Sequence, residues 1–118
     1  MRNNGYIEKS WGYELIWATN DQYCGKLLVF TKPRASSSMH FHKNKDETWF
    51  VNAGQFMLRY IDTKTGEHKE MLIKEGDTWH NPPLQPHQLE ALQPNSVIFE
   101  VSTADDTDDT YRVTPSSK

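Results

Sequence analysis

Three histidines and one glutamate are spaced along the chain as ligands of a metal ion would be. His40 and His42 are two residues apart, so on a β-strand both imidazoles point to the same face. Glu47 follows a short charged loop and would bring a carboxylate beside the imidazoles if the two flanking strands pair. His87 follows a proline-rich turn and opens another strand. We therefore predict that these four side chains converge on one cation.

The predicted donor set is chemically suited to a divalent first-row metal. Three imidazole nitrogens and one carboxylate oxygen can bind Fe, Mn, Co, Ni, Cu or Zn, and the sequence does not choose among these metals. Four protein ligands on an octahedral ion leave two positions for water or substrate, which is typical of a reactive site rather than a closed structural one. If both imidazoles of the pair faced outward they would simply be solvated, and the spacing alone leaves that alternative open.

The elements that would carry these side chains are predicted to be short β-strands. Turn residues separate the β-rich runs, and no segment has a 3.6-residue apolar period over two or more turns. Gly66 lies in a hairpin turn where a positive φ is expected. The runs cover residues 12–19, 23–31, 36–42, 47–53, 55–62, 68–74, 77–81, 87–92 and 96–102. About nine short strands indicate an all-β protein built as an antiparallel sandwich or barrel.

Length and composition limit the class of protein further. The 118 residues are enough for one domain, and 36% apolar residues are few for a helical bundle. The formal charge of −3 gives no support for the basic stripe of a nucleic-acid-binding protein. No apolar run approaches the roughly 18 residues of a membrane span, and residues 1–5 do not resemble a signal peptide. With Cys24 alone no internal disulfide can form, so we predict a cytoplasmic protein in which this thiol is a small buried hydrophobe.

Two segments resemble the conserved motifs of the cupin superfamily. His40-Phe41-His42, followed by Glu47 and Gly54, resembles the first motif, and Gly76, Pro82 and His87 resemble the second. Arg34 and Leu84 stand where the motifs usually carry glycine, and Ala91 stands where the second usually ends in asparagine. The resemblance implies a single cupin-type antiparallel β-barrel (double-stranded β-helix) over residues 1–118, with a core at about 9–103 and an acidic tail at about 104–118. It also implies that His40, His42, Glu47 and His87 bind one divalent ion.

A narrower resemblance points to sugar chemistry. Residues 9–14, KSWGYE, are similar to the Lys/Arg-Pro-Trp-Gly strand that begins the cupin-type mannose-6-phosphate isomerase domain, with serine in place of the proline. Residues 47–54 and 98–112 resemble two further segments of that family, although the loop before Glu47 is longer by about two residues. The resemblance implies aldose–ketose isomerisation of a phosphorylated sugar through an enediolate. It also implies a catalytic role for Arg112.

Such an isomerisation needs a base that reaches a carbon-bound proton and a cation that holds the phosphate. His80 is a candidate base, although it alternates with Trp79 and only one of the two can face inward. Lys26 and Arg112 are candidate cations that could instead point outward or pair with nearby acids. Arg34 and Arg59 are the other cations considered. The catalytic residues predicted are thus Arg112, His80 and Lys26, and the acidic run 105–109 is expected to be a solvated face.

Other functions remain open for the same scaffold. One is a non-catalytic module that binds a sugar or another small ligand, and another is a metal-dependent lyase or dioxygenase acting on a small acid. Lysines and arginines facing the cavity would favour a phosphorylated substrate, whereas a purely apolar cavity would favour a dioxygenase. A homodimer is expected, formed through the N-terminal strand near Tyr6, Trp11 and Tyr13.

Overall fold

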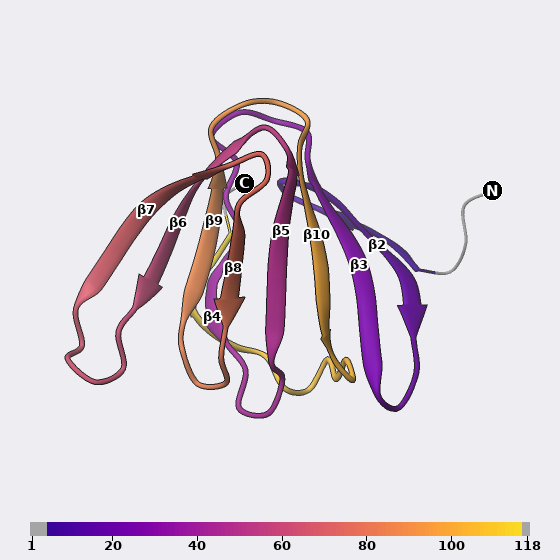
Figure 1. Ribbon diagram of the computed structural model, residues 1–118, viewed down its shortest axis with the longest axis vertical. Coiled ribbons are helices and arrows are strands. Elements are labelled where there is room, and N and C mark those ends of the chain that lie inside the picture. Colours follow the sequence, from indigo (N-terminus) through magenta and orange to yellow (C-terminus); the bar gives the residue numbers. More distant parts are fainter. Residues whose placement is uncertain (1–4, 117–118) are drawn as a thin grey trace.

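The computed structural model describes residues 5–116, and over this range the protein is built from eleven β-strands without a helix (Figure 1). Within the same range no helix is long and apolar enough to cross a membrane. The strands are β1 (Tyr6–Lys9), β2 (Gly12–Thr19), β3 (Tyr23–Phe30), β4 (Met39–Phe41), β5 (Glu47–Ala53), β6 (Gln55–Ile61), β7 (His68–Lys74), β8 (Thr78–Asn81), β9 (His87–Ala91), β10 (Ser96–Thr103) and β11 (Tyr111–Thr114).

The strands form two antiparallel sheets that enclose the core between them. One sheet has six strands in the order β1-β2-β3-β10-β5-β8, and the other has five in the order β11-β4-β9-β6-β7. The predicted all-β antiparallel barrel is confirmed, with eleven strands in place of about nine. The two additional strands, β1 and β11, have four residues each and pair with β2 and β4.

Aromatic rings and branched side chains fill the space between the sheets. Trp11 stacks on Phe30 with ring centroids 4.2 Å apart, and Phe30 meets Phe56 edge to face at 5.1 Å. Leu58 and Ile98 are fully buried in the same cluster. Trp11 was expected near a dimer surface, but it lies in the turn between β1 and β2 with its ring packed on Phe30, and it is buried.

Two turns keep a left-handed backbone although they lack the glycine of the motifs they resemble. Arg34 has a φ of 66° and Leu84 a φ of 76°, a conformation that costs a non-glycine residue about 1–2 kcal/mol. The Leu84 amide donates a 2.6 Å hydrogen bond to the carbonyl oxygen of His42. This bond ties the proline-rich turn to the end of β4. The predicted positive φ of Gly66 is also confirmed, at 76°.

Candidate metal centre

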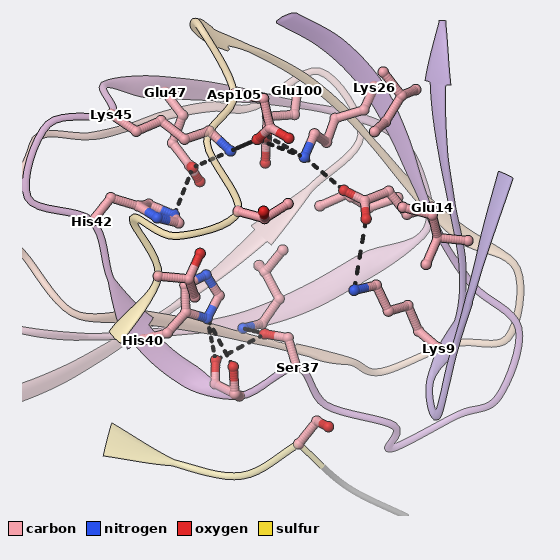
Figure 2. A pocket seen from close by; sticks show the side chains of 18 of the residues that line it. Lys9, Glu14, Lys26, Ser37, His40, His42, Lys45, Glu47, Glu100 and Asp105 are labelled. Atoms are coloured by element: carbon pink, nitrogen blue, oxygen red, sulfur yellow. Dashed lines mark hydrogen bonds and ion pairs between the residues drawn. The ribbon is translucent and has the colours of Figure 1, made fainter. Parts of the chain in front are cut away.

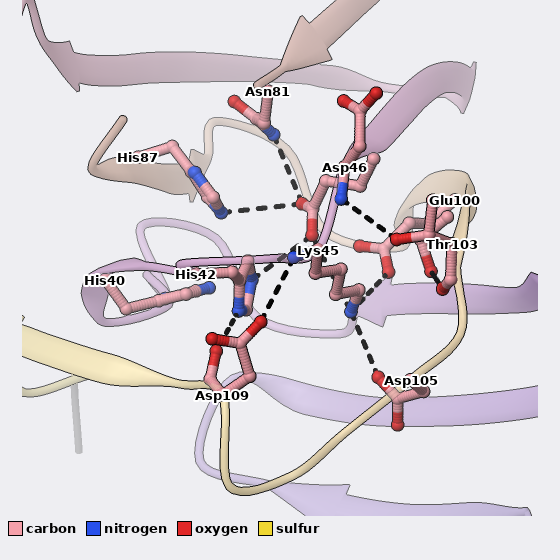
Figure 3. Close-up of polar contacts among 12 residues, drawn as sticks. His40, His42, Lys45, Asp46, Asn81, His87, Glu100, Thr103, Asp105 and Asp109 are labelled. Atoms are coloured by element: carbon pink, nitrogen blue, oxygen red, sulfur yellow. Dashed lines mark hydrogen bonds and ion pairs between the residues drawn. The ribbon is translucent and has the colours of Figure 1, made fainter. Parts of the chain in front are cut away.

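The four predicted ligands come from both sheets and meet inside the barrel. His40 lies on β4 directly opposite His87 of β9, and His42 follows the end of β4. Glu47 opens β5 in the other sheet, where β5 pairs with β10 and β8. The strands that flank the loop between His42 and Glu47 therefore do not pair, which was the condition considered for bringing the carboxylate to the imidazoles. The Glu47 carboxylate reaches His42 and His87 from the other sheet, and Figure 3 shows the side chains of His40, His42 and His87 gathered in one place.

The ligand atoms are close enough to share one ion. One ring nitrogen from each of His40, His42 and His87 lies within 4.8 Å of the other two. Glu47 places one carboxylate oxygen 3.2 Å from Nε2 of His42 and the other 3.4 Å from Nε2 of His87. His42, Glu47 and His87 are buried, and His40 is half-buried. The structure thus brings all four predicted residues together.

Backbone carbonyl groups orient the three imidazoles. Nδ1 of His40 lies 3.0 Å from the Ser38 oxygen, Nδ1 of His42 lies 2.8 Å from the Asp109 oxygen, and Nδ1 of His87 lies 3.0 Å from the Gln85 oxygen. Because a carbonyl oxygen only accepts, each Nδ1 carries the proton that is donated. In the neutral imidazole Nε2 then has a free lone pair, which is the arrangement typical of metal-binding histidines.

The protonation of two of the three imidazoles, His40 and His87, favours binding of a cation. Burial, reinforced by His87, lowers the pKa of His40 to about 3, and burial with the nearby His42 lowers the pKa of His87 to about 4. Both imidazoles are therefore neutral near pH 7. Nε2 of His87 is buried without a hydrogen-bond partner among the described residues. A buried lone pair without a partner, beside two further imidazoles and a carboxylate, fits a bound divalent ion.

Lys45 is held next to the cluster by three carboxylates. Its Nζ lies 3.1 Å from Asp105, 3.4 Å from Glu100 and 3.7 Å from Glu47. Burial alone would lower the pKa of Lys45, but the three acids, Glu100 above all, outweigh that effect and raise it. The ammonium is therefore charged at physiological pH, and it helps to keep Glu47 ionised.

Lys26 continues the chain of ion pairs away from the metal centre (Figure 2). Its Nζ lies 2.6 Å from Glu14, 3.3 Å from Asp105 and 3.9 Å from Glu100. The carboxylates that Lys26 and Lys45 contact outnumber the two ammonium groups. A divalent cation at the histidine cluster would balance this excess of negative charge, which is costly to bury unpaired.

A cavity of about 290 Å³ connects the histidine cluster to this chain of charges. Apolar side chains such as Trp49 and Leu28 line part of it, and Lys9 and Arg112 line it as well. The pocket is therefore not the purely apolar cavity that would indicate a dioxygenase.

The structure brings two of the three predicted catalytic residues to the cavity. Lys26 lines it from β3, and Arg112 lines it from β11, where it lies opposite His40. His80 is not brought there, because its side chain is 57% exposed and pairs with Asp46 at the surface. The half-buried Trp79 takes the inward position instead, packed against the core.

The other two arginines considered lie away from the cavity. Arg34 and Arg59 both bind Glu90, at 3.3 and 2.7 Å, and Arg59 also binds Glu70 at 3.2 Å. These pairs are on the five-stranded sheet, and neither arginine lines the pocket.

The acidic run was interpreted as a solvated face, and that interpretation is wrong for two of its members. Asp105 pairs with both cavity lysines. The Asp109 carboxylate accepts hydrogen bonds from the backbone amides of Lys43, Asn44 and Lys45, at 2.8, 3.0 and 3.1 Å. These acids are drawn inward because a buried ammonium and a row of loop amides both need acceptors.

Sequence reasoning also missed Glu14, Glu100 and Lys45 as residues of the site. Glu100 had a signal, since it is the single charge within the otherwise uncharged strand Ser96–Thr103. Such a charge, when it faces inward, must find a partner. Lys45 had none, because a lysine in a charged loop is usually solvated.

Comparison with known proteins places the site in a family. The family model described as Cupin matches residues 23–117. An oxalate decarboxylase from Bacillus subtilis superposes with a TM-score of 0.78 at 22% identity, covering 92% of this chain and 30% of that one. KdgF from Halomonas sp. gives 0.72 at 20% identity, covering 87% and 88% of the two chains.

A third structure, the capsular polysaccharide assembling protein CapF from Staphylococcus aureus, gives a TM-score of 0.76 at 16% identity. The superposition covers 92% of this chain and 32% of the CapF chain. The chain thus spans about a third of CapF and of the oxalate decarboxylase, and these likenesses concern the fold. A search of the curated proteins found no match.

Proposed function

This chain belongs to the cupin family, and we propose that it is a metal-dependent enzyme that interconverts an aldose and a ketose form of a small phosphorylated sugar. The observation that carries the proposal is the cavity, in which the histidine cluster faces a wall of lysines and carboxylates. The hydroxyl groups of a sugar require many hydrogen-bond partners, and this wall offers both donors and acceptors. The resemblance of residues 9–14 and 47–54 to the mannose-6-phosphate isomerase domain supports the same substrate class.

The metal would be held by His40, His42, Glu47 and His87, which supply three lone pairs and a carboxylate. When bound, a divalent ion polarises a substrate carbonyl and stabilises the negative charge that develops on its oxygen. Its identity within the first-row series is left to measurement.

Glu100 is the proton acceptor that we assign. Trp49 Nε1 donates a 2.9 Å hydrogen bond to one carboxylate oxygen of Glu100, and the other oxygen is buried without a hydrogen-bond partner among the described residues. That second oxygen lies 3.9 Å from Nζ of Lys26 and 3.4 Å from Nζ of Lys45. It would take a proton from carbon 2 of the aldose and return it to carbon 1, while the carbon 2 hydroxyl proton passes to the oxygen on carbon 1.

The phosphate would lie between Lys9 and Arg112. Lys26 and Lys45 are each surrounded by acids, so they have little charge left to offer a substrate. Lys9 has one partner in the cavity, Glu14 at 3.7 Å, and Arg112 makes no ion pair within residues 5–116. Both line the pocket, and Arg112 is exposed, so an incoming dianion would reach them first.

The test is a coupled assay with mannose 6-phosphate on the purified chain loaded in turn with Mn, Co, Fe and Zn. We expect turnover with at least one metal. We also expect Glu100→Gln to lower kcat by at least about a hundredfold with unchanged metal content, because the proton acceptor is removed while the four metal ligands stay. The matched control Glu70→Gln alters an exposed acid and should leave kcat unchanged. Absence of turnover with every metal would refute the proposal.

The small cavity favours one second candidate, cleavage of a small organic acid. Its volume of about 290 Å³ lies at the lower end of the roughly 300–1,000 Å³ typical of ligand pockets. Incubating the metal-loaded protein with oxalate and other short acids, and following carbon dioxide release, tests this candidate. Sugar binding without turnover in calorimetry would instead identify a non-catalytic binding protein.

A further inference from the structure

The six-stranded sheet places its charged residues on the inside of the barrel. Strands β2, β3, β5 and β10 each contain one charged residue, and these are Glu14, Lys26, Glu47 and Glu100. All four are buried and face the cavity. Because side chains alternate along a strand, the outward positions of these four strands carry no charge. The polarity of this part of the sheet is the inverse of a usual surface sheet, which has polar residues facing water.

The outward side of these strands carries large apolar side chains that remain exposed. Trp17 is 56% exposed, Tyr23 55%, Val101 54%, and Phe50 and Phe99 41% each. We call these five residues the outer apolar face.

The five residues lie on neighbouring strands, which stand side by side in Figure 1. Phe50 is directly opposite Phe99, and their ring centroids are 6.3 Å apart. Val101 is opposite Gly25, and the Trp17 ring covers Gly25 so closely that a Cβ there would lie 2.5 Å from it. The outer apolar face is therefore continuous from β5 across β10 and β3 to β2.

The size of this face matches what a small homodimer requires. Its four aromatic side chains are about half exposed, which corresponds to roughly 400 Å² at 150–250 Å² for each ring. Patches of roughly 300–600 Å² are the largest on ordinary monomers and are often functional. The half-buried Leu15, Leu27 and Val97 extend the face toward the roughly 800 Å² that each partner of a standard interface buries.

We propose that a second copy of this chain binds the outer apolar face, with the two faces packed against each other about a two-fold axis. In such an interface one patch meets itself, so a charged patch would repel its own copy and an uncharged one does not. The outward positions of these strands carry no charge, so they offer no ionic contact to a charged partner such as a nucleic acid. The five-stranded sheet differs, because Arg59, Glu70 and Glu90 form ion pairs on it.

The inference is independent of the sugar chemistry, and it moves the interface away from the N-terminal strand expected above. The test is size-exclusion chromatography with light scattering on the full chain. We expect twice the chain mass of 13.8 kDa. A mass of 13.8 kDa at every concentration up to about 1 mM would mean that any self-association has a Kd weaker than roughly millimolar. That result would overturn the proposal.

Substitutions locate the interface. Val101→Glu places a charge in the centre of the outer apolar face and should give a monomer. Leu72→Glu makes the same change at an equally exposed residue of β7, 51% exposed, and should leave the dimer intact. If Leu72→Glu dissociates the dimer and Val101→Glu does not, the proposed face is wrong. Far-ultraviolet circular dichroism checks folding, and Tyr23→Glu repeats the test if Val101→Glu does not fold.

Mixing two variants identifies the occupant. Val101→Glu and Val101→Lys should each be monomeric alone, and an equimolar mixture should form a heterodimer because the opposite charges face each other across the interface. If the native chain is a dimer and the mixture stays monomeric while both variants are folded, self-association through this face is excluded.

Discussion

Lys26 is the residue whose replacement tests the buried ion network most sharply. Its side chain is 8% exposed, and its ammonium lies 2.6 Å from Glu14 and within 4 Å of Glu100 and Asp105. In Lys26→Met the side chain keeps a similar length and an apolar stem, so packing is preserved while the charge is removed. The carboxylates then stay buried with only Lys45 to balance Glu100 and Asp105.

Removing one partner of a buried pair costs about 3–5 kcal/mol, because the other charge is left uncompensated. For a chain of this size that corresponds to a fall in Tm of roughly 10–20 °C. The control is Lys9→Met, which removes the same group from the same partner, Glu14. Lys9 is 34% exposed and lies 3.7 Å from Glu14, so its pair is worth at most about 1 kcal/mol.

The assay is urea unfolding of the native chain and of both variants near pH 7, with calorimetry for Tm. If Lys26→Met and Lys9→Met differ in free energy of unfolding by less than about 1 kcal/mol, the network is solvated and does not depend on burial. That result would refute the reasoning given for the cavity wall.

The loss of stability in Lys26→Met, relative to the native chain, should depend on pH with a definite sign. Burial would lower the pKa of Lys26, but Glu100 and Glu14 outweigh it and raise the pKa above the usual 10.5. A raised lysine pKa gives stability that is fully present below the unfolded value and is lost as the pH rises through the folded value. The difference in free energy of unfolding between the native chain and Lys26→Met should therefore be constant near neutral pH and become smaller above about pH 10.5. If this difference in free energy of unfolding became larger above that pH, the assignment of a raised pKa to Lys26 would be contradicted.

Three further predictions concern residues that shape the site and its strands. Asp109→Ala should lower the free energy of unfolding by about 2–4 kcal/mol, measured with urea, since three loop amides lose a charged acceptor. The same variant should bind metal about tenfold more weakly by calorimetry, because the backbone carbonyl that orients His42 is then no longer fixed by the bonds of the Asp109 carboxylate to the loop amides; unchanged affinity would show that these bonds are not needed to position the carbonyl. Gly54→Ala should cost at least about 2 kcal/mol in the same unfolding assay, with a new Cβ 2.0 Å from Ser96 Oγ at a φ of 81°. Gly66→Ala, where the space is open at a φ of 76°, should cost less, and equal losses would contradict the packing argument.

The sequence predicted that His40 and His42 share one face because this relation is local. Residues two apart on an extended segment point to one face, and this holds for His40 on β4 and for His42 directly after it. Glu47 and His87 were added because each begins a β-rich run, and the motif resemblance then supported all four residues. The local sequence could not predict that Glu47 approaches the histidines from the other sheet, because this depends on which sheet each strand joins.

The residues that pattern reasoning missed depend on partners far away in the chain. Lys45 is buried because Glu100 and Asp105 reach it, and Asp109 is buried because the loop of residues 43–45 turns its amides inward. No local pattern separates these from ordinary surface charges. The strand β11 was missed for a similar reason, since its four exposed residues carry no alternation and are ordered by pairing with β4.

The central claim is that three imidazoles and one glutamate hold a single cation, and metal content tests it most directly. After loading with divalent metal and desalting, elemental analysis should give one ion per chain for the native protein. It should give nearly none for His87→Ala, while His68→Ala, which alters an exposed histidine on β7, should keep the native value. An unchanged metal-to-protein ratio in His87→Ala, or no metal bound by the native chain, would contradict the account.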